Sequence, residues 1–135
     1  MYKGYLVKVG NSNIPTKYIA ESSYYATPAQ RQDLDSFRDN KGRLHRDVVE
    51  NMPSKVEFKL MAGLSEEQVN EVVSIFYRNY TVRAERKALI SFYDPSTGQY
   101  CEEYMYLKDT KYQLDYIDET GMPYFKEIQY VLTGY

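Results

Sequence analysis

The most regular hydrophobic pattern in the chain predicts an amphipathic helix near its centre. Ser65 and Gln68 form the two ends of a capping box, and Glu66 and Glu67 suit the positive end of the helix dipole. Apolar side chains then follow at i, i+3, i+4, i+7, i+8 and i+11, namely Val69, Val72, Val73, Phe76, Tyr77 and Tyr80. The opposite face is polar, so we expect a surface helix of about four turns over Glu66 to Asn79.

Alternation of apolar and polar positions predicts strands in much of the remaining chain. The clearest case is Lys55 to Leu60, whose apolar residues all fall on one face. Further strands are expected at Tyr5 to Val9, Ile14 to Ile19, Arg86 to Tyr93, Gln99 to Leu107, Thr110 to Ile117 and Tyr124 to Thr133. The turn from Asp94 to Gly98 makes a hairpin of two of them. Because helix and strands are segregated, we expect a mainly β (α+β) fold or a β-sandwich.

Residues 21–54 form a long connection with weak periodicity. Its charges cancel: Arg31, Arg38, Lys41, Arg43 and Arg46 stand against Asp33, Asp35, Asp39, Asp47 and Glu50. A compact domain rarely carries such a loop unless it is functional or becomes ordered on a partner. Asp39 to Gly42 resembles the turn of a small hairpin, with Phe37 before it and Leu44 after it. We therefore favour an extended arm containing a short ribbon over plain disorder.

Composition narrows the class of protein. A chain of 135 residues with 43% hydrophobic and 27% charged residues predicts a single globular domain over residues 1–135. A net charge of −2 argues against specific binding to nucleic acid. The mean hydropathy is −0.64, and no run approaches the ~18 apolar residues of a membrane helix, so no membrane contact is expected. The first residues lack the apolar core of a signal peptide, which argues against secretion.

The residues that carry metal or catalytic chemistry are sparse. A calcium loop that starts at Asp33 fails, because Phe37 and Arg38 occupy the positions of a ligand and the glycine. The single Cys101 and the single His45 make a poor zinc set and match no nucleophile motif. Glu102 and its neighbour Glu103 point to opposite faces of a strand. We expect no catalytic residue, no metal site and no cofactor, and hence no enzyme.

The tyrosine content is abnormal, at 16 Tyr with 5 Phe and no Trp. Two groups share strand faces: Tyr100, Tyr104 and Tyr106 beside Glu102, and Tyr112 and Tyr116 beside Leu114. Tyrosine gives large contact area at low rotamer cost and suits protein interfaces. Each tyrosine could instead reflect the β-propensity of aromatics at the edge of a core. For the set as a whole we favour an interface.

Charge is unevenly spread along the chain. Basic residues gather early and after the helix, as Lys3, Lys8 and Lys17 and then Arg78, Arg83, Arg86 and Lys87. The segment from Asp94 to Gly121 is acidic. Two regions of opposite charge allow head-to-tail association, which closes into a ring when the rotation permits. The alternative is that the opposite charges meet within one subunit.

Several segments together resemble a family of small tail proteins of siphophages and prophages of Gram-positive bacteria. They are Ile14 to Ile19, Asp33 to Ser36, Arg38-Asp39, Gly42 to Arg46, Lys55 to Phe58, Glu85 to Lys87, Tyr93 to Pro95, Thr97-Gly98, Met105-Tyr106 and Val131 to Tyr135. The element order also resembles tail-tube and distal-tail proteins. That resemblance implies a β-sandwich or half-closed barrel, one flanking helix, and an arm that reaches a neighbouring subunit. None of these motifs is catalytic.

The sequence-based hypothesis is therefore a tail structural protein of the tail-tube, distal-tail or tail-completion type. Its expected partners are copies of itself, arranged in a ring whose number of subunits the sequence does not give, and other tail proteins, in the virion tail or in the host cytoplasm during assembly. The candidate interface residues are Arg31, Asp33, Asp35, Arg38, Asp39, Arg43, His45, Arg46, Tyr100, Tyr104, Tyr106, Tyr112 and Tyr116. The alternative is a module that binds a small ligand or a host protein through a surface lined by Tyr104, Tyr106, Tyr112 or Tyr116.

Overall fold

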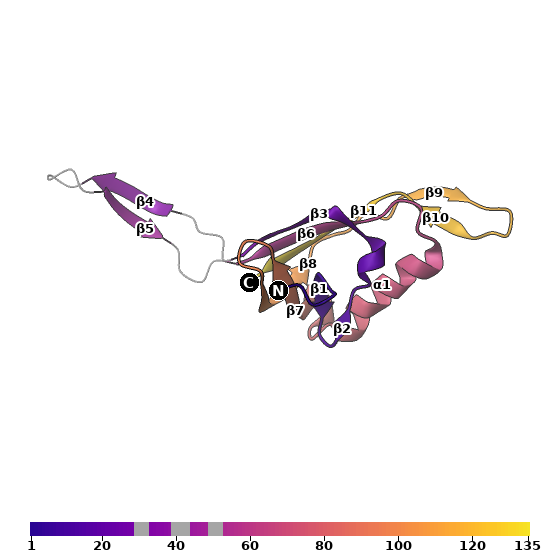
Figure 1. Ribbon diagram of the computed structural model, residues 1–135, viewed down its shortest axis with the longest axis horizontal. Coiled ribbons are helices and arrows are strands. Elements are labelled where there is room, and N and C mark those ends of the chain that lie inside the picture. Colours follow the sequence, from indigo (N-terminus) through magenta and orange to yellow (C-terminus); the bar gives the residue numbers. More distant parts are fainter. Residues whose placement is uncertain (29–32, 39–43, 49–52) are drawn as a thin grey trace.

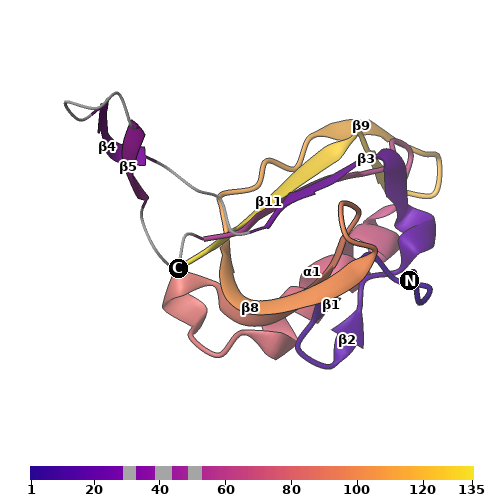
Figure 2. The same cartoon turned by 60° about the vertical axis from the view of Figure 1, so that its left-hand side comes forward.

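The main element of the structure is one antiparallel sheet of seven strands. The structure is a computed structural model that describes residues 1–28, 33–38, 44–48 and 53–135, with residues 33–38 and 44–48 described by their backbone. From edge to edge the strands are β2 (Ser12–Asn13), β1 (Val7–Val9), β7 (Lys87–Asp94), β8 (Gln99–Leu107), β11 (Ile128–Gly134), β6 (Lys55–Leu60) and β3 (Ile19–Thr27). Figure 2 shows this sheet strongly bent, with the helix α1 (Glu66–Asn79) beside it.

The helix begins and ends where its pattern predicts. The backbone N–H of Gln68 donates to Ser65 Oγ at 3.4 Å, and the Gln68 side chain accepts from the backbone N–H of Ser65 at 3.0 Å. Two orphan donors of the first turn are thereby satisfied. The predicted helix over Glu66 to Asn79 is confirmed.

The core lies between α1 and the buried face of the sheet. Phe76 of α1 stacks on Tyr130 of β11, and Tyr130 stacks on Phe58 of β6, both with ring centroids 5.5 Å apart. All three side chains are buried, and Tyr130 is fully enclosed. One of the many tyrosines therefore forms the centre of the core, because its ring fills the space between helix and sheet.

The bent sheet forms a half-closed barrel, because its two edge strands in the part of the chain that the structure describes, β2 and β3, do not pair with each other. Within the described residues, β3 forms a ladder only with β6, and β2 only with β1. The Tyr24 hydroxyl of β3 donates to the backbone C=O of Tyr93 in β7, so a side chain spans the gap where no ladder forms. The predicted mainly β fold with one flanking helix is confirmed, and the half-closed barrel is the form it takes.

Two small hairpins stand outside the main sheet (Figure 1). One pairs β9 (Leu114–Ile117) with β10 (Pro123–Phe125), and the other pairs β4 (Asp33–Arg38) with β5 (Leu44–Val48). Two short 3-10 turns, η1 (Thr16–Tyr18) and η2 (Arg83–Glu85), complete the described elements.

The expected strand from Ile14 to Ile19 is wrong. Only Ser12–Asn13 pairs with β1, and Thr16–Tyr18 is a 3-10 turn in which the Tyr18 N–H donates to the Pro15 C=O at 3.0 Å. Pro15 has no N–H to give to a ladder, which favours a turn at this point. The apolar spacing came from residues buried in a turn, since Ile14 and Tyr18 both reach the core.

Three other strand boundaries differ from expectation. The strand expected over Thr110 to Ile117 begins at Leu114, and the one expected over Tyr124 to Thr133 divides into β10 and β11, because β10 pairs in the outer hairpin while β11 joins the main sheet. Residues 21–27, assigned to the long connection, belong to β3. Its ladder with β6 shifts register between Ala20 and Tyr25, and this irregularity hides the alternation that marks a strand.

Candidate interaction surfaces

The long connection is an insertion between two paired strands. Thr27 at the end of β3 lies opposite Lys55 at the start of β6, and Ala26 lies opposite Val56. Opposed residues in an antiparallel ladder have Cα atoms only about 4.5–5.5 Å apart. The chain therefore leaves the barrel at Thr27 and re-enters it beside the same point, and residues 28–54 form the arm.

The return point of the arm is anchored to the neighbouring strands. The backbone N–H and the hydroxyl of Ser54 both donate to the Glu103 carboxylate, at 3.2 and 2.6 Å, and the Gly134 N–H donates to the Ser54 C=O at 2.9 Å. A Cβ at position 134 would lie 2.0 Å from Glu103 Oε1. Because Gly134 has no side chain, the Glu103 carboxylate has room to accept the hydrogen bonds of Ser54 at the base of the arm.

The short ribbon predicted inside the arm is present. β4 and β5 pair antiparallel, with Phe37 opposite His45 and Arg38 opposite Leu44. Asp33, Asp35 and Arg38 thus lie on β4, and His45 and Arg46 lie on β5. Arg31, Asp39 and Arg43 lie outside the described residues.

Tyr100 is used inside the subunit. Its hydroxyl donates to the backbone C=O of Tyr5 at 2.6 Å and accepts from the backbone N–H of Lys3 at 2.9 Å. Its ring lies 4.6 Å from the ring of Tyr5 and 5.4 Å from that of Tyr93. These contacts hold the N-terminal segment against β7 and β8.

Tyr104 and Tyr106 belong to a second group, on β8 and at the C-terminus. The ring of Tyr106 meets that of Tyr135 edge to face at 5.5 Å. The Lys87 ammonium lies 5.1 Å from the ring centroid of Tyr104 and 4.9 Å from that of Tyr135, within cation–π range. Tyr104 and Tyr135 are both exposed, so this group forms a solvent-exposed aromatic surface around the Lys87 ammonium.

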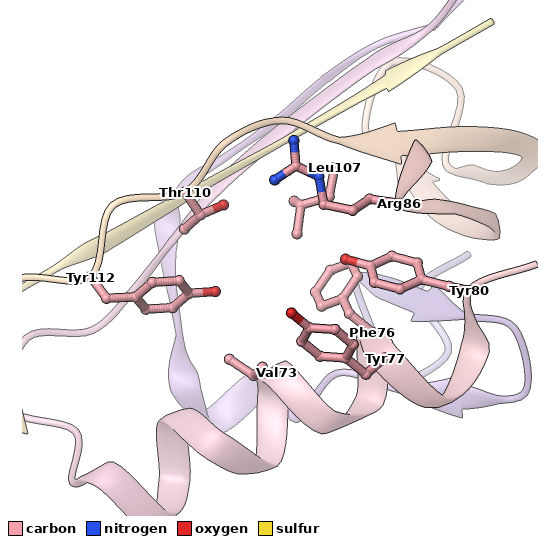
Figure 3. Close-up of a pocket in the computed structure, with 8 residues that line it drawn as sticks. All are labelled: Val73, Phe76, Tyr77, Tyr80, Arg86, Leu107, Thr110 and Tyr112. Atoms are coloured by element: carbon pink, nitrogen blue, oxygen red, sulfur yellow. The ribbon is translucent and has the colours of Figure 1, made fainter. Parts of the chain in front are cut away.

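Tyr112 lines a small cavity between α1 and the segment that follows β8 (Figure 3). The cavity measures about 110 Å³. Its lining consists of Val73, Phe76, Tyr77, Tyr80, Arg86, Leu107, Thr110 and Tyr112. Figure 3 shows the hydroxyls of the three tyrosines turned towards the space between the helix and the opposite wall.

Two tyrosines of this cavity, Tyr80 and Tyr112, have raised pKa values and stay neutral at physiological pH. Burial raises the pKa of Tyr80 to about 12 and also raises the pKa of Tyr112 and Tyr130. The Tyr112 and Tyr130 hydroxyls lie 3.0 Å apart, which ties the wall of the cavity to the core. Arg86, in the left-handed region with φ 52°, pairs with the exposed Asp109 at 2.7 Å.

Tyr116 lies on the outer hairpin of β9 and β10. Its ring stacks on that of Tyr124 with centroids 4.9 Å apart and an interplanar angle of 12°. All four residues of β9 are exposed. At the turn, Asp118 accepts from the hydroxyl of Thr120 and from the N–H groups of Thr120 and Met122, and these bonds lower its pKa. The carboxylate thereby stabilises the hairpin turn.

The candidate tyrosines therefore lie in separate places. Of Tyr104, Tyr106, Tyr112 and Tyr116, only Tyr112 lines the cavity, and its partners there, Tyr77 and Tyr80, come from the helix. The helical spacing of Tyr77 and Tyr80 was visible in the sequence, but it indicated a core stripe. Arg86 joins them only because the chain turns back after α1, through η2, into β7.

The remaining chemistry of the described residues is limited. Burial raises the pKa of the Cys101 thiol, which makes the thiolate scarcer and the residue less reactive. In the part of the chain that the structure describes, no group of three or more His, Cys, Asp or Glu side chains is arranged to hold a metal ion. None of the helices described there is long and apolar enough to cross a membrane.

Comparisons with known proteins show the family that the sequence matches and a solved structure with a similar fold. The sequence matches a family of unknown function, DUF6711, over residues 1–135. No curated protein matches the chain in sequence. A chain from the tail of an empty GTA particle, refined with helical C6 symmetry, has a similar fold with a TM-score of 0.54 and 10% sequence identity, covering 100% of this chain and 95% of the other. At this identity the similarity concerns the fold, and it confirms the tail-like fold expected from the element order.

Proposed function

The chain belongs to the DUF6711 family over its full 135 residues, and we propose that it is a structural protein of a phage or phage-like tail. The observation that carries this proposal is the similarity of fold to a tail chain of the GTA particle, which spans 100% of this chain. Similarity of fold alone does not define a function, so the surfaces of this chain have to support the same role.

The surfaces that support assembly are the arm and the outer hairpin. Both leave the half-closed barrel as antiparallel ribbons that share no ladder with the main sheet. Segments of this kind bind by laying extended backbone and side chains on a neighbour. The proposed role is non-enzymatic, with copies of the chain and other tail proteins as partners, in the tail of a virion.

The finer proposal is a ring in which each arm reaches the next subunit. The neighbouring structure has C6 symmetry, so six copies are the number to test first. Ring symmetry requires two different surfaces on each subunit, and the uneven charge of this chain provides them. Such a ring fits each of three types of protein: a tail-tube, a distal-tail and a tail-completion protein. The proposed source is a siphophage or prophage of a Gram-positive bacterium.

Deletion of residues 31–47 tests the proposal. Because Thr27 and Lys55 are already paired, a shorter loop joins them without disturbing the ladder of β3 and β6. We expect the full chain to form rings or short tubes at high concentration, and the deleted chain to stay a folded monomer. Native mass spectrometry and negative-stain electron microscopy measure assembly, and circular dichroism measures folding. Equal monomer populations for both chains at high concentration would show that self-assembly through the arm is wrong.

The ligand-binding alternative has weaker support. Pockets for small molecules usually enclose about 300–1,000 Å³. The cavity that Tyr112 lines measures about 110 Å³, and Tyr104, Tyr106 and Tyr116 lie elsewhere. The cavity is the size of a single side chain, which fits a protein partner better than a separate ligand.

A further inference from the structure

The outer hairpin exposes apolar side chains on a firmly held support. Leu114, Tyr116 and Ile117 are 48%, 53% and 59% exposed. At its base the Phe125 N–H donates to the Leu64 C=O at 2.9 Å, and the Phe125 C=O accepts from Gly63 at 2.8 Å. The hairpin is thus fastened to the loop before α1 and presents its outer residues in a defined direction. Exposed apolar residues on a rigid projection are typical of an interaction site.

The two faces of this hairpin differ. The ladder shifts register here, because Leu114 lies opposite Phe125 and Tyr116 lies opposite Tyr124, with Asp115 as the extra residue between them. Opposed residues share a face, so Tyr116 lies on one face while Leu114 and Ile117 share the other. The first face is partly covered, because Tyr116 stacks on Tyr124. The second face carries two exposed aliphatic side chains, and the exposed Asp115 lies between them in the strand. That combination requires a partner surface with an apolar hollow beside a cation.

The cavity beside α1 has this composition. Val73, Phe76 and Leu107 provide apolar walls, and Arg86 lies at its edge. A hollow on the order of 150 Å³ holds one benzene-sized group, so about 110 Å³ suits one aliphatic side chain. The side chain of Asp109, which pairs with Arg86, is 96% exposed. An ion pair this exposed is weak, so another carboxylate can replace Asp109.

The charges of the two regions are complementary. Between residues 114 and 125 the hairpin carries three acidic residues and no basic one, a net charge of −3. Between residues 72 and 88, the helix end and the turn after it carry four basic residues and one acidic one, a net charge of +3. Complementary charge of this size steers association and fixes its orientation.

The two regions cannot meet within one subunit. The hairpin is attached at the start of α1, where Ser65 bridges to Tyr124, and the cavity lies along the second half of the helix, from Val73 to Tyr80. A rise of about 1.5 Å per residue separates the helix start from the middle of the cavity by on the order of 15–20 Å. Figure 1 shows the hairpin directed away from the helix end.

We propose that the β9–β10 hairpin of one copy docks on the next copy, with Ile117 in the cavity beside α1 and Asp115 paired with Arg86. This inference rests on the proposed assembly of the chain and specifies one of its contacts. The hairpin and the cavity are different surfaces of the subunit, so the contact is head to tail and repeats around a ring. It is separate from the contact that the arm makes.

Two matched substitutions on the full chain test the docking. Ile117→Asp places a charge on the docking face, and Tyr116→Asp places the same charge on the opposite face of the same strand. Loss of a buried aliphatic side chain predicts that Ile117→Asp raises the protein concentration needed for half-assembly by about tenfold or more, while Tyr116→Asp leaves it close to wild type. Circular dichroism checks that both variants fold, which is expected because both positions are exposed.

A cysteine pair locates the contact directly. The variant Ile117→Cys with Val73→Cys, in a Cys101→Ser background, is oxidised and run on a denaturing gel without reductant. Docking predicts a ladder of trimers and higher species, whereas each single cysteine forms dimers at most. Wild-type assembly without a ladder, together with an unimpaired Ile117→Asp variant, overturns the docking and leaves the tail proposal standing. A wild-type chain that stays monomeric at every concentration overturns both the docking and the proposed ring of identical copies.

Discussion

At the scale of single residues, position 134 needs a glycine because Glu103 lies next to it, and its own backbone conformation does not require one. Its conformation is an ordinary one for a strand, but an added Cβ would meet Glu103 Oε1 at 2.0 Å and Pro53 Cβ at 3.2 Å. The first contact is with the end of a flexible side chain, which can move only by leaving Ser54. The small size of residue 134 and the anchor of the arm are therefore one feature of the structure.

Gly134→Ala is expected to destabilise the protein by about 1–3 kcal/mol, the range for disturbing a buried hydrogen bond to a charged group. The measurement is urea unfolding of four proteins: wild type, Gly134→Ala, Glu103→Ala and the double variant. If the substitution acts through Glu103, the two costs are not additive, and the double variant is close to Glu103→Ala. Additive costs would contradict the link.

A second prediction at this scale concerns the tyrosines beside the cavity. Burial raises the pKa of Tyr80 from 10.0 to about 12, so between these values the unfolded chain has lost a proton that the folded chain keeps. The unfolded state then binds fewer protons, and the free energy of unfolding falls as pH rises. We expect the urea midpoint to fall between pH 10 and pH 12 and to fall less steeply in Tyr80→Phe. An unchanged slope in that variant would assign the effect to other groups.

At the scale of elements, the edge strand β3 decides how far the barrel closes. It pairs with β6 on one side and meets β7 through the Tyr24 hydroxyl and the Tyr93 C=O. One side-chain hydrogen bond replaces a ladder, so β3 keeps most of an open edge. An open edge is a place where a strand of a neighbour can add.

Tyr24→Phe removes this tie and leaves the Tyr93 carbonyl without its donor. The expected cost is about 1 kcal/mol in the free energy of unfolding, with faster amide hydrogen exchange along β3 and little change in β8 and β11. Hydrogen exchange followed by mass spectrometry measures both effects. Uniform loss of protection over the whole sheet would contradict a role restricted to the edge.

At the scale of the whole molecule, the described ribbon of the arm, β4 and β5, forms its own sheet and shares no ladder with the barrel. The ends of the arm, Thr27 and Lys55, are held together by the ladder whether or not the residues between them are present. The deletion of residues 31–47 is therefore expected to change the free energy of unfolding by less than about 1 kcal/mol, and under the proposed function it is also expected to abolish assembly. The two proposed contacts, arm and hairpin, are separable by experiment for this reason.

Local structure was predictable wherever neighbouring residues decide it. The capping box and the apolar stripe defined α1 to the residue, and strict alternation defined Lys55–Leu60. The short ribbon in the arm followed from the turn between Phe37 and Leu44. Prediction was poorer where the ladder is irregular, as at the register shift of β3, and where a proline turn mimicked a strand before Ile19.

The candidate surfaces were less predictable, because they combine distant residues. Tyr112, Tyr80 and Arg86 come from different elements and meet only where the chain packs α1 against the barrel. The sequence pattern grouped Tyr100 with Tyr104 and Tyr106, but Tyr100 packs against the N-terminal segment. It grouped Tyr116 with Tyr112, but Tyr116 lies on the outer hairpin. The excess of tyrosine thus divides among core, N-terminal clasp, cavity and exposed surface.

The sequence by itself determined the helix, most strands, the net charge of −2 and the presence of an arm, because each depends on composition or on contacts a few residues apart. Only the tertiary structure decided that the sheet closes halfway, that the arm returns beside its start, and that an acidic hairpin and a basic cavity lie at opposite ends of α1. Those features depend on which strands become neighbours, and strand pairing is a long-range choice made by packing of the whole core.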